Sequence, residues 1–216
     1  MAKAKGVIPE TVLPDGYAIL NADDELVYDM RRNVEGNLAL FSMDEDNSHI
    51  KAMQRQNGLC AVFENGFITI CKGEWKMRVI KAVNVPLTYG GKARFMIQNV
   101  LPAVLAAYVR GFSIDDIKVG LETFIPSASQ TPGRLNLFHF NNFKVLLDYA
   151  HNEAGMEALH NFIDNLEGSP KVGIIAGIGD RRDEDNIGIG KMASQMFDEI
   201  IIRQDKHLRG KTEEEL

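Results

Sequence analysis

The chain has 216 residues, of which 45% are hydrophobic and 25% charged, with a formal net charge of −6. This composition supports one sizeable hydrophobic core or two small ones, and it excludes an intrinsically disordered chain. The acidic balance argues against nucleic-acid and anionic-membrane partners, because these need clustered Lys and Arg. The sequence shows no signal peptide and no apolar run of the roughly 18 residues that a membrane-spanning helix needs, so we expect a cytoplasmic protein.

Up to about residue 127 the sequence predicts an irregular mixture of strands and helices. Residues 59–80 should form a meander whose first turn is Asn65-Gly66, a pair typical of two-residue hairpins. In that register Cys60 and Cys71 lie directly opposite one another; a disulfide is conceivable, but two reduced thiols fit a reducing cytosol better. Two cysteines alone indicate no metal site. The other strands and the two helices of this part are expected at residues 17–20, 37–42, 93–110 and from Ser113 onward.

From residue 128 onward, strands and helices alternate regularly. Apolar strands alternating with helices are typical of a parallel sheet covered on both faces. The stretch 126–133, rich in Ser, Gln and Pro, separates this part from the first. The expected fold is therefore α/β, with domains at 1–127 and 128–216. Strands are expected at 145–147, 172–176 and 199–202, with one helix capped by Asn152 and another near 187–197.

The carboxyl ends of the three apolar strands carry the polar residues that a ligand site needs. Ligands of open parallel sheets bind beyond these ends, where carboxylates bind ribose hydroxyls and guanidiniums bind carboxylates or phosphates. The first two clusters also have structural interpretations, as a helix-capping pair and as a loop that forms salt bridges within itself. The candidates are Asp148 with His151, the run Asp180, Arg181, Arg182 and Asp183, and residues 203–209 including Arg209.

The chain contains no phosphate-binding loop of its own. Gly210-Lys211-Thr212 resembles the end of the motif Gly-x-x-x-x-Gly-Lys-Ser/Thr, but the position of its first glycine holds Asp205. An aspartate there would repel phosphate and lacks the backbone freedom of glycine. Gly90-Gly91-Lys92 fails as well, because Ala93 supplies no hydroxyl. Because no phosphate loop is present, we expect a fragment that is inactive by itself. Thr212 and Glu215 look like the opening of a helix that cannot be completed, which also suggests truncation, although a frayed acidic tail fits as well.

Segments in both parts carry recognisable motifs, namely Asp148-Tyr149-Ala150-His151-Asn152 and residues 17–24, 90–96, 132–138, 179–185 and 208–211. These motifs resemble the Mur ligase superfamily and, within it, the cyanophycin synthetase family. The resemblance covers nearly the whole chain in order, which single motifs would not establish. It implies the end of a Mur-type central ATPase domain, with a mixed sheet, meander and helices, followed by the first half of a Rossmann-like Mur C-terminal domain.

The resemblance implies an ATP-dependent amide ligase with ATP and Mg2+ as cofactors. Such enzymes phosphorylate a carboxylate with ATP, and an amine then displaces phosphate from the acyl phosphate, while Mg2+ screens the phosphate charges. In cyanophycin synthetases this half joins arginine to aspartate side-chain carboxylates of a growing polymer. Arginine and a polymer acceptor are therefore the expected partners beside ATP. Neither nucleic acid nor a membrane is expected, and homo-oligomerisation of the full-length enzyme is left open.

The resemblance also implies roles for individual residues. Asn99 matches the asparagine that meets the adenine base, Arg134 the arginine that reaches ATP from the domain junction, and Asp148 the acid that holds the ribose. Lys5 falls where many Mur ligases carry a carbamylated lysine that helps to bind metal, although a frayed N-terminal lysine fits equally well. His151 either orients its loop or contacts ligand. By location, Asp180, Arg181, Arg182 and Arg209 are either substrate contacts or residues of a solvated loop.

Two alternatives to this function stay open. One is another Mur-type ligase, of the muramyl-peptide or folylpolyglutamate type. Phe95-Met96 argues against a peptidoglycan substrate, because many Mur ligases have His-Asn at this place before the helix asparagine. The other alternative is a module that binds a nucleotide or polymer without turnover.

Overall fold

The computed structural model describes residues 2–177, 182–204, 209 and 212. The chain divides into two compact units, Met1–Ile125 and Pro126–Leu216. This division falls two residues before the boundary expected from the sequence. The candidate residues Lys5 and Asn99 belong to the first unit, and all other candidates belong to the second.

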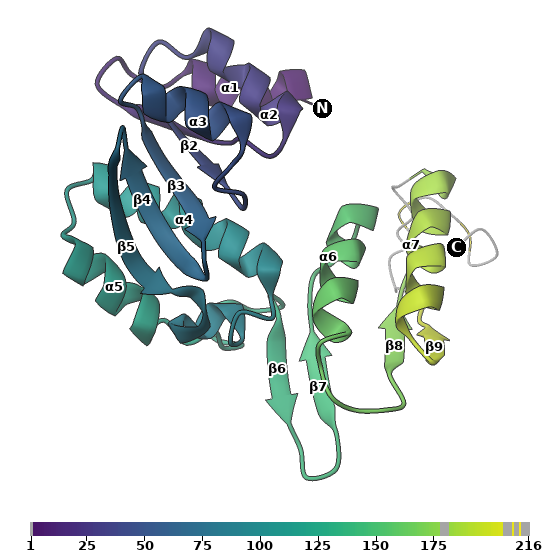
Figure 1. Ribbon diagram of the computed structural model, residues 1–216. Helices are drawn as coiled ribbons and strands as arrows, with labels where there is room; N and C mark the ends of the chain where they lie inside the picture. Colours follow the sequence, from purple (N-terminus) through teal and green to yellow (C-terminus); the bar gives the residue numbers. More distant parts are fainter. Residues whose placement is uncertain (1, 178–181, 205–208, 210–211, 213–216) are drawn as a thin grey trace. The chain divides into compact units, whose positions relative to one another are not determined.

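The first unit is built on a five-stranded sheet in the order β1-β2-β3-β4-β5 (Figure 1). The first three strands are parallel, and β4 and β5 continue as the antiparallel meander that the sequence predicts. The elements are α1 (Ala2–Glu10), β1 (Tyr17–Asn21), α2 (Glu25–Asp29), β2 (Asn37–Ser42), α3 (Ser48–Arg55), β3 (Leu59–Glu64), β4 (Phe67–Lys72), β5 (Trp75–Lys81), α4 (Arg94–Val109) and α5 (Ile114–Thr123), with 3-10 turns at Met30–Asn33, Ala82–Asn84 and Pro86–Thr88.

Helices cover both faces of this sheet (Figure 1). On one face, α4 and α5 close a core that includes Ile68, Ile70 and Leu101. On the other face, α3 packs through Ile50 against a second cluster that includes Cys71. The two clusters draw on alternate residues of β4, because successive side chains of a strand point to opposite faces.

The hairpin β3–β4 has the register that the sequence predicts, with Cys60 opposite Cys71. Asn65 and Gly66 both have positive φ, 50° and 81°, as a type I′ turn requires. Both cysteines are free and buried. Burial raises the pKa of the Cys60 thiol to about 12, so the folded chain keeps this thiol protonated and unreactive.

The second unit departs from the continuous parallel sheet that the sequence predicts. β7 (Lys144–Leu147) pairs antiparallel with β6 (Asn136–His139), a strand that the sequence did not indicate. β8 (Val172–Ile175) pairs parallel with β9 (Glu199–Ile202), and no ladder joins the two pairs within the described residues. β6 precedes β7 closely in the chain, so their pairing costs little loop-closure entropy.

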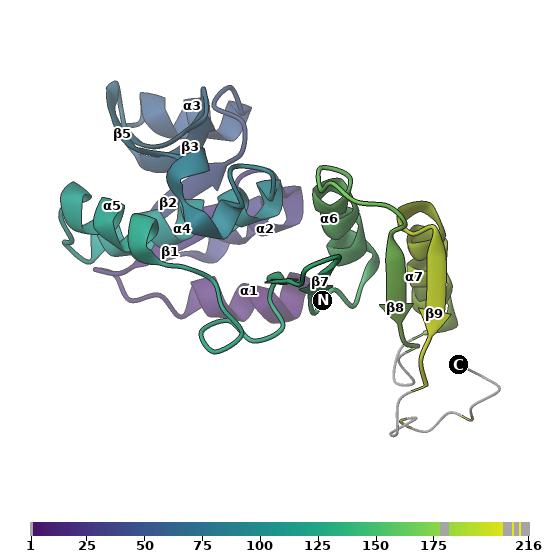
Figure 2. The ribbon, with the colours of Figure 1, turned by 90° about the horizontal axis from the view of Figure 1, so that it is seen from below.

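The helices of the second unit are α6 (Glu153–Ile163) and α7 (Asp183–Met196), which pack on one another. β8 and β9 lie side by side along α7 (Figure 2). α7 begins four residues earlier than the sequence predicts, because Asp183, Glu184 and Asp185 occupy its first turn, where negative charge is favourable. The expected burial of the apolar strands on both faces is wrong for β8 and β9. Their exposed side chains are Val172, Ile174, Ile200, Ile201 and Ile202.

Every helix within the described ranges is too short or too polar to cross a membrane.

Candidate functional site

Asp148 directly follows β7, and its carboxylate bonds to the loop before β6 and to the loop before α6. Its Oδ2 accepts the backbone N–H of Leu135 at 2.9 Å, and its Oδ1 accepts that of Ala150 at 2.8 Å. It does not cap α6, since Asn152 does so by accepting the N–H of Gly155 at 2.7 Å, as the sequence predicts. A carboxylate oxygen has a second lone pair, so Asp148 can also accept a hydrogen bond from a ligand hydroxyl.

Arg134 precedes Leu135, whose backbone N–H donates to Asp148. Its guanidinium carbon is 4.9 Å from the centre of the Tyr149 ring, within the range of a cation–π interaction. Both side chains are exposed. The structure thus brings Arg134 and Asp148, two of the residues expected to meet a nucleotide, to the same end of β7.

His151 belongs to the same loop as Asp148. Its Nδ1 is 2.9 Å from the carbonyl oxygen of Tyr149, and the two rings lie 5.1 Å apart. A carbonyl oxygen only accepts hydrogen bonds, so Nδ1 carries a proton. This bond folds the side chain back onto its own loop, and it supports the interpretation that His151 orients the loop.

Asn136 was not recognised as a site residue from the sequence, yet it holds the backbone on either side of Gly133 and Arg134 through hydrogen bonds. It is only 3% exposed and stands at the first position of β6. Its Oδ1 accepts the N–H of Gly133 at 2.8 Å, and its Nδ2 donates to the carbonyls of Thr131 at 3.0 Å and Arg134 at 3.3 Å. No sequence pattern indicated its role, which comes from burial and from these backbone contacts.

The second candidate cluster shows internal pairing. Arg182 precedes α7 and donates from Nε and Nη2 to the two carboxylate oxygens of Asp185, at 3.1 and 2.8 Å. Asp185 raises the pKa of Arg182. This pairing agrees with the loop interpretation for Arg182, and a substrate contact stays a prediction. Arg209 is exposed with a left-handed φ of 50°, whereas Asp180 and Arg181 lie outside the described residues.

The first unit holds the remaining candidates. Asn99 is exposed on α4, where its Nδ2 lies 3.8 Å from the sulfur of Met96. Lys5 is exposed on α1. Across the described residues no group of three or more His, Cys, Asp and Glu is placed to hold a metal ion. The roles of Asn99 and Lys5 therefore stay predictions.

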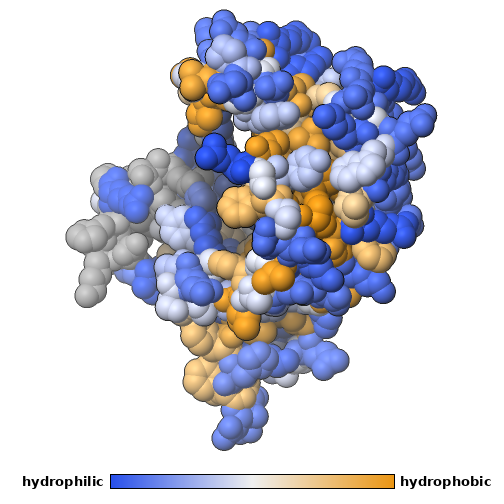
Figure 3. Space-filling view, turned by 90° about the vertical axis from the view of Figure 1, so that its left-hand side faces the viewer, coloured by the Kyte–Doolittle hydropathy of each residue, from blue (hydrophilic) through white to orange (hydrophobic). Residues whose placement is uncertain are grey.

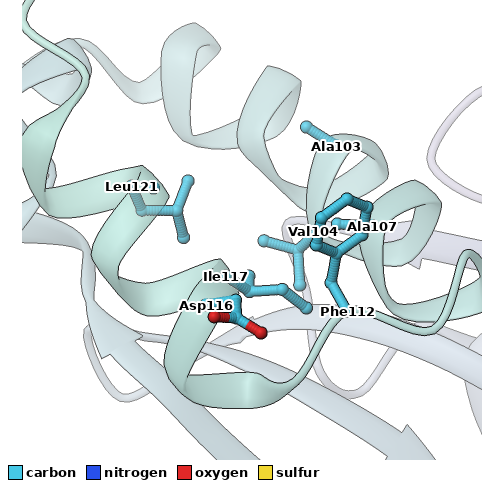
Figure 4. A pocket seen from close by; sticks show the side chains of 8 residues that line it. Ala103, Val104, Ala107, Phe112, Asp116, Ile117 and Leu121 are labelled. Carbon is cyan, nitrogen blue, oxygen red and sulfur yellow. The ribbon is translucent and has the colours of Figure 1, made fainter.

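A cavity of about 220 Å³ lies between α4 and α5. Its lining is almost entirely apolar, and side chains such as Phe112 and Leu121 point into it (Figure 4). The carboxylate of its one charged residue, Asp116, is already hydrogen-bonded to Ser113. Figure 3 shows hydrophobic residues interspersed with hydrophilic ones over one face of the molecule.

Comparisons with known proteins show which family the chain resembles. Residues 133–216 match the family described as Mur ligase, glutamate ligase domain. The chain is 53% identical over 211 residues to the cyanophycin synthetase of Geminocystis herdmanii and 50% identical to that of Crocosphaera subtropica. In both cases the alignment covers 98% of this chain and 24% of the relative. The chain thus spans about a quarter of the length of the curated relatives it matches.

Solved structures share the fold. MurF from Acinetobacter baumannii superposes with a TM-score of 0.65 at 21% identity, over 93% of this chain and 41% of that one. E. coli FolC in complex with DHPP and ADP superposes with a TM-score of 0.60 at 16% identity, over 92% of this chain and 41% of that one. These structures show the fold alone. The family match and the sequence relatives identify residues 133–216 as a Mur ligase C-terminal domain, in a chain homologous to part of cyanophycin synthetase.

Proposed function

We propose that this chain is part of an ATP-dependent amide ligase of the cyanophycin synthetase type. The enzyme would act in the cytoplasm and join arginine to aspartate side-chain carboxylates of a polymer. The observation that carries the proposal is that Arg134 and Asp148 lie at the same end of β7, in a chain about half identical to cyanophycin synthetases. A ligase of the muramyl type is the weaker candidate, because UDP-N-acetylmuramate–L-alanine ligase of Acetivibrio thermocellus is only 30% identical over 155 residues.

Different residues would bind the ribose, the phosphates and the adenine base of ATP. When bound, ATP supplies the phosphoryl group that activates a carboxylate. Asp148 would accept hydrogen bonds from the ribose hydroxyls through the lone pairs that its loop leaves available. Arg134 would direct its guanidinium toward phosphate, with its orientation limited by the Tyr149 ring. Asn99 would meet the adenine base.

The described residues suit ATP but not Mg2+. An exposed guanidinium and a carboxylate held by two backbone amides suit the phosphate and ribose groups of ATP. No described cluster of acidic side chains suits Mg2+, so we derive no step through that ion. A carbamylated Lys5 would add one oxygen ligand, and the substrate roles of Asp180, Arg181, Arg182 and Arg209 belong to the same proposal.

Arg134→Met tests this function in the longer protein that carries the chain. We expect the KM for ATP to rise at least about tenfold, as the loss of a hydrogen bond from a charged group predicts. The measurement is arginine-dependent phosphate release in the presence of a primer polymer. Asp148→Asn should weaken ATP binding too, but it also disturbs the backbone amides of Leu135 and Ala150, so Arg134→Met is the sharper variant.

Arg55→Met is the matched control, since Arg55 is an exposed arginine at the end of α3 in the first unit. It should leave the KM for ATP unchanged. An unchanged KM in Arg134→Met would remove Arg134 from the nucleotide site. Phosphate release that does not depend on arginine would exclude the cyanophycin-type reaction.

A further inference from the structure

The loop before β6 is held from inside by two side chains. The carboxamide of Asn136 makes three hydrogen bonds to the backbone of residues 131–134. The carboxylate of Asp148 accepts a hydrogen bond from the next backbone N–H along the chain, that of Leu135. Asn136 is 3% exposed and Leu135 fully buried, so water cannot replace these bonds without opening the unit.

The backbone of this loop needs such anchors. Gly133 has a φ of 68° and Leu135 a φ of 53°. A non-glycine residue in the left-handed region costs roughly 1 kcal/mol, and such a conformation persists where its surroundings over-determine it. The anchors lie on either side of Arg134 in the chain. They therefore fix the direction in which the Arg134 side chain leaves the backbone.

The far end of Arg134 is limited as well. Its guanidinium stacks on Tyr149, which follows Asp148 directly. Asp148 thus connects the two restraints. Its carboxylate accepts the N–H of Leu135, and the next residue, Tyr149, carries the ring on which the guanidinium stacks. A long side chain oriented in this way loses less entropy when it binds an anion.

We propose that Asn136 is a positioning residue, which acts on ATP through Arg134 by holding residues 131–134 in the conformation that stacks the guanidinium on Tyr149. This inference rests on the proposed function, because it assumes that Arg134 meets the nucleotide. Asn136 itself is buried and does not touch the ligand.

The first test measures the stack in the 216-residue chain without nucleotide. Ring current from Tyr149 should shift the Hε resonance of Arg134 upfield, and Tyr149→Leu should abolish that shift. Asn136→Asp keeps the acceptor for Gly133 but turns a carboxylate toward the carbonyls of Thr131 and Arg134, so the shift should be lost at pH 7. As the pH falls, the introduced carboxyl becomes protonated and can donate to one carbonyl, and the shift should return.

The second test is kinetic and uses the longer protein. Asn136→Asp should raise the KM for ATP about tenfold, the size of effect expected from misdirecting a binding group, with a smaller change in kcat. In the Arg134→Met background the same substitution should change the KM less than twofold, because it has no guanidinium left to misdirect. Asn136→Ser is the second variant, should Asn136→Asp not fold. The control is Asn142→Asp, the same change at an exposed asparagine on the β6–β7 hairpin.

The outcomes separate the two proposals. Additive effects of Asn136→Asp and Arg134→Met, or an unchanged KM in a folded Asn136 variant, overturn the positioning role while the ligase function stands. An Arg134 Hε shift that survives in Asn136→Asp overturns it too. If the wild-type protein carries out no ATP-dependent ligation, the proposed function fails, and the inference about Asn136 fails with it.

Discussion

At the scale of single residues, the ion pairs at the end of β3 set a pH dependence. Lys76 donates a hydrogen bond to Glu64, which is only 7% exposed, and Glu45 lies 3.9 Å from the same ammonium group. The bond from Lys76 lowers the pKa of Glu64, whereas the bond with Glu64 raises the pKa of Glu45. Glu64 therefore stabilises the fold above its unfolded-state pKa, and this contribution disappears as the pH falls through its folded-state value.

Lys76→Met should therefore destabilise the chain most at neutral pH. We expect a loss of about 1–2 kcal/mol at pH 7, a value reduced by the partial exposure of the lysine. The loss should shrink below pH 4.5, the usual pKa of a glutamate, because Glu64 becomes protonated in both states. Urea unfolding between pH 3.5 and about 8 measures it.

A loss that does not change with pH would contradict this account. Lys118→Met is the control, since Lys118 and Glu122 form an exposed pair with 4.0 Å between Nζ and Oε1. We expect this control to change the free energy of unfolding by less than about 0.5 kcal/mol.

At the scale of elements, local signals decided what the sequence could predict. The β3–β4 register follows from Asn65-Gly66, because a two-residue turn fixes the pairing of its strands. α1 was missed, since Gly6 and Pro9 inside it are poor helix formers. β6 was missed because its four residues show no alternation of apolar and polar side chains, so that only the pairing with β7 makes it a strand.

The start of α5 at Ser113, which the sequence predicts, is confirmed, and a capping box holds it. Ser113 accepts the N–H of Asp116 at 3.1 Å, and Asp116 accepts the N–H of Ser113 at 3.3 Å. Ser113→Ala should cost about 1 kcal/mol, the usual value of an N-cap, and lower the Tm of the first unit by about 3–6 °C. Ser194→Ala, inside α7, should leave the Tm unchanged, because alanine suits a helix interior. An unchanged Tm in Ser113→Ala would show that packing alone holds the start of α5.

At the scale of the whole molecule, the two units differ in how completely they bury their sheets. Helices cover both faces of the first sheet, and Ile68 and Ile70 are fully buried. In the second unit Ile174 is 69% exposed and Ile202 70% exposed. Because burial of apolar surface is the main favourable term in folding, the second unit should be the less stable one.

Hydrogen exchange followed by mass spectrometry checks this difference. Amides of β3 and β4 should exchange far more slowly than those of β8 and β9, and heating should unfold residues 126–216 first. Residues 1–125 expressed alone should keep the slow exchange of β3 and β4. A single transition with equal protection in both units would contradict the prediction.

The sequence predicted only part of the candidate site, because some of its residues owe their role to contacts that form only in the folded chain. Asp148 could be singled out because it is a charged residue beyond a strand, and Arg134 because the resemblance to Mur ligases implies its role. Asn136 could not, because its importance comes from burial and from three backbone contacts that exist only once β6 has paired with β7. The side-by-side arrangement of three apolar strands was wrong, since strand order depends on contacts that apolar patterning does not specify.

The parallel pair of β8 and β9 has a practical consequence for anyone handling this chain in a test tube. In the described residues each strand pairs only with the other, and the isoleucines of β9 are exposed. Proteins usually protect such sheet borders with charge, proline or a covering segment, because an open apolar border recruits further chains. Purified alone, the chain should become turbid with rising concentration and salt, and work at low concentration would keep it monomeric.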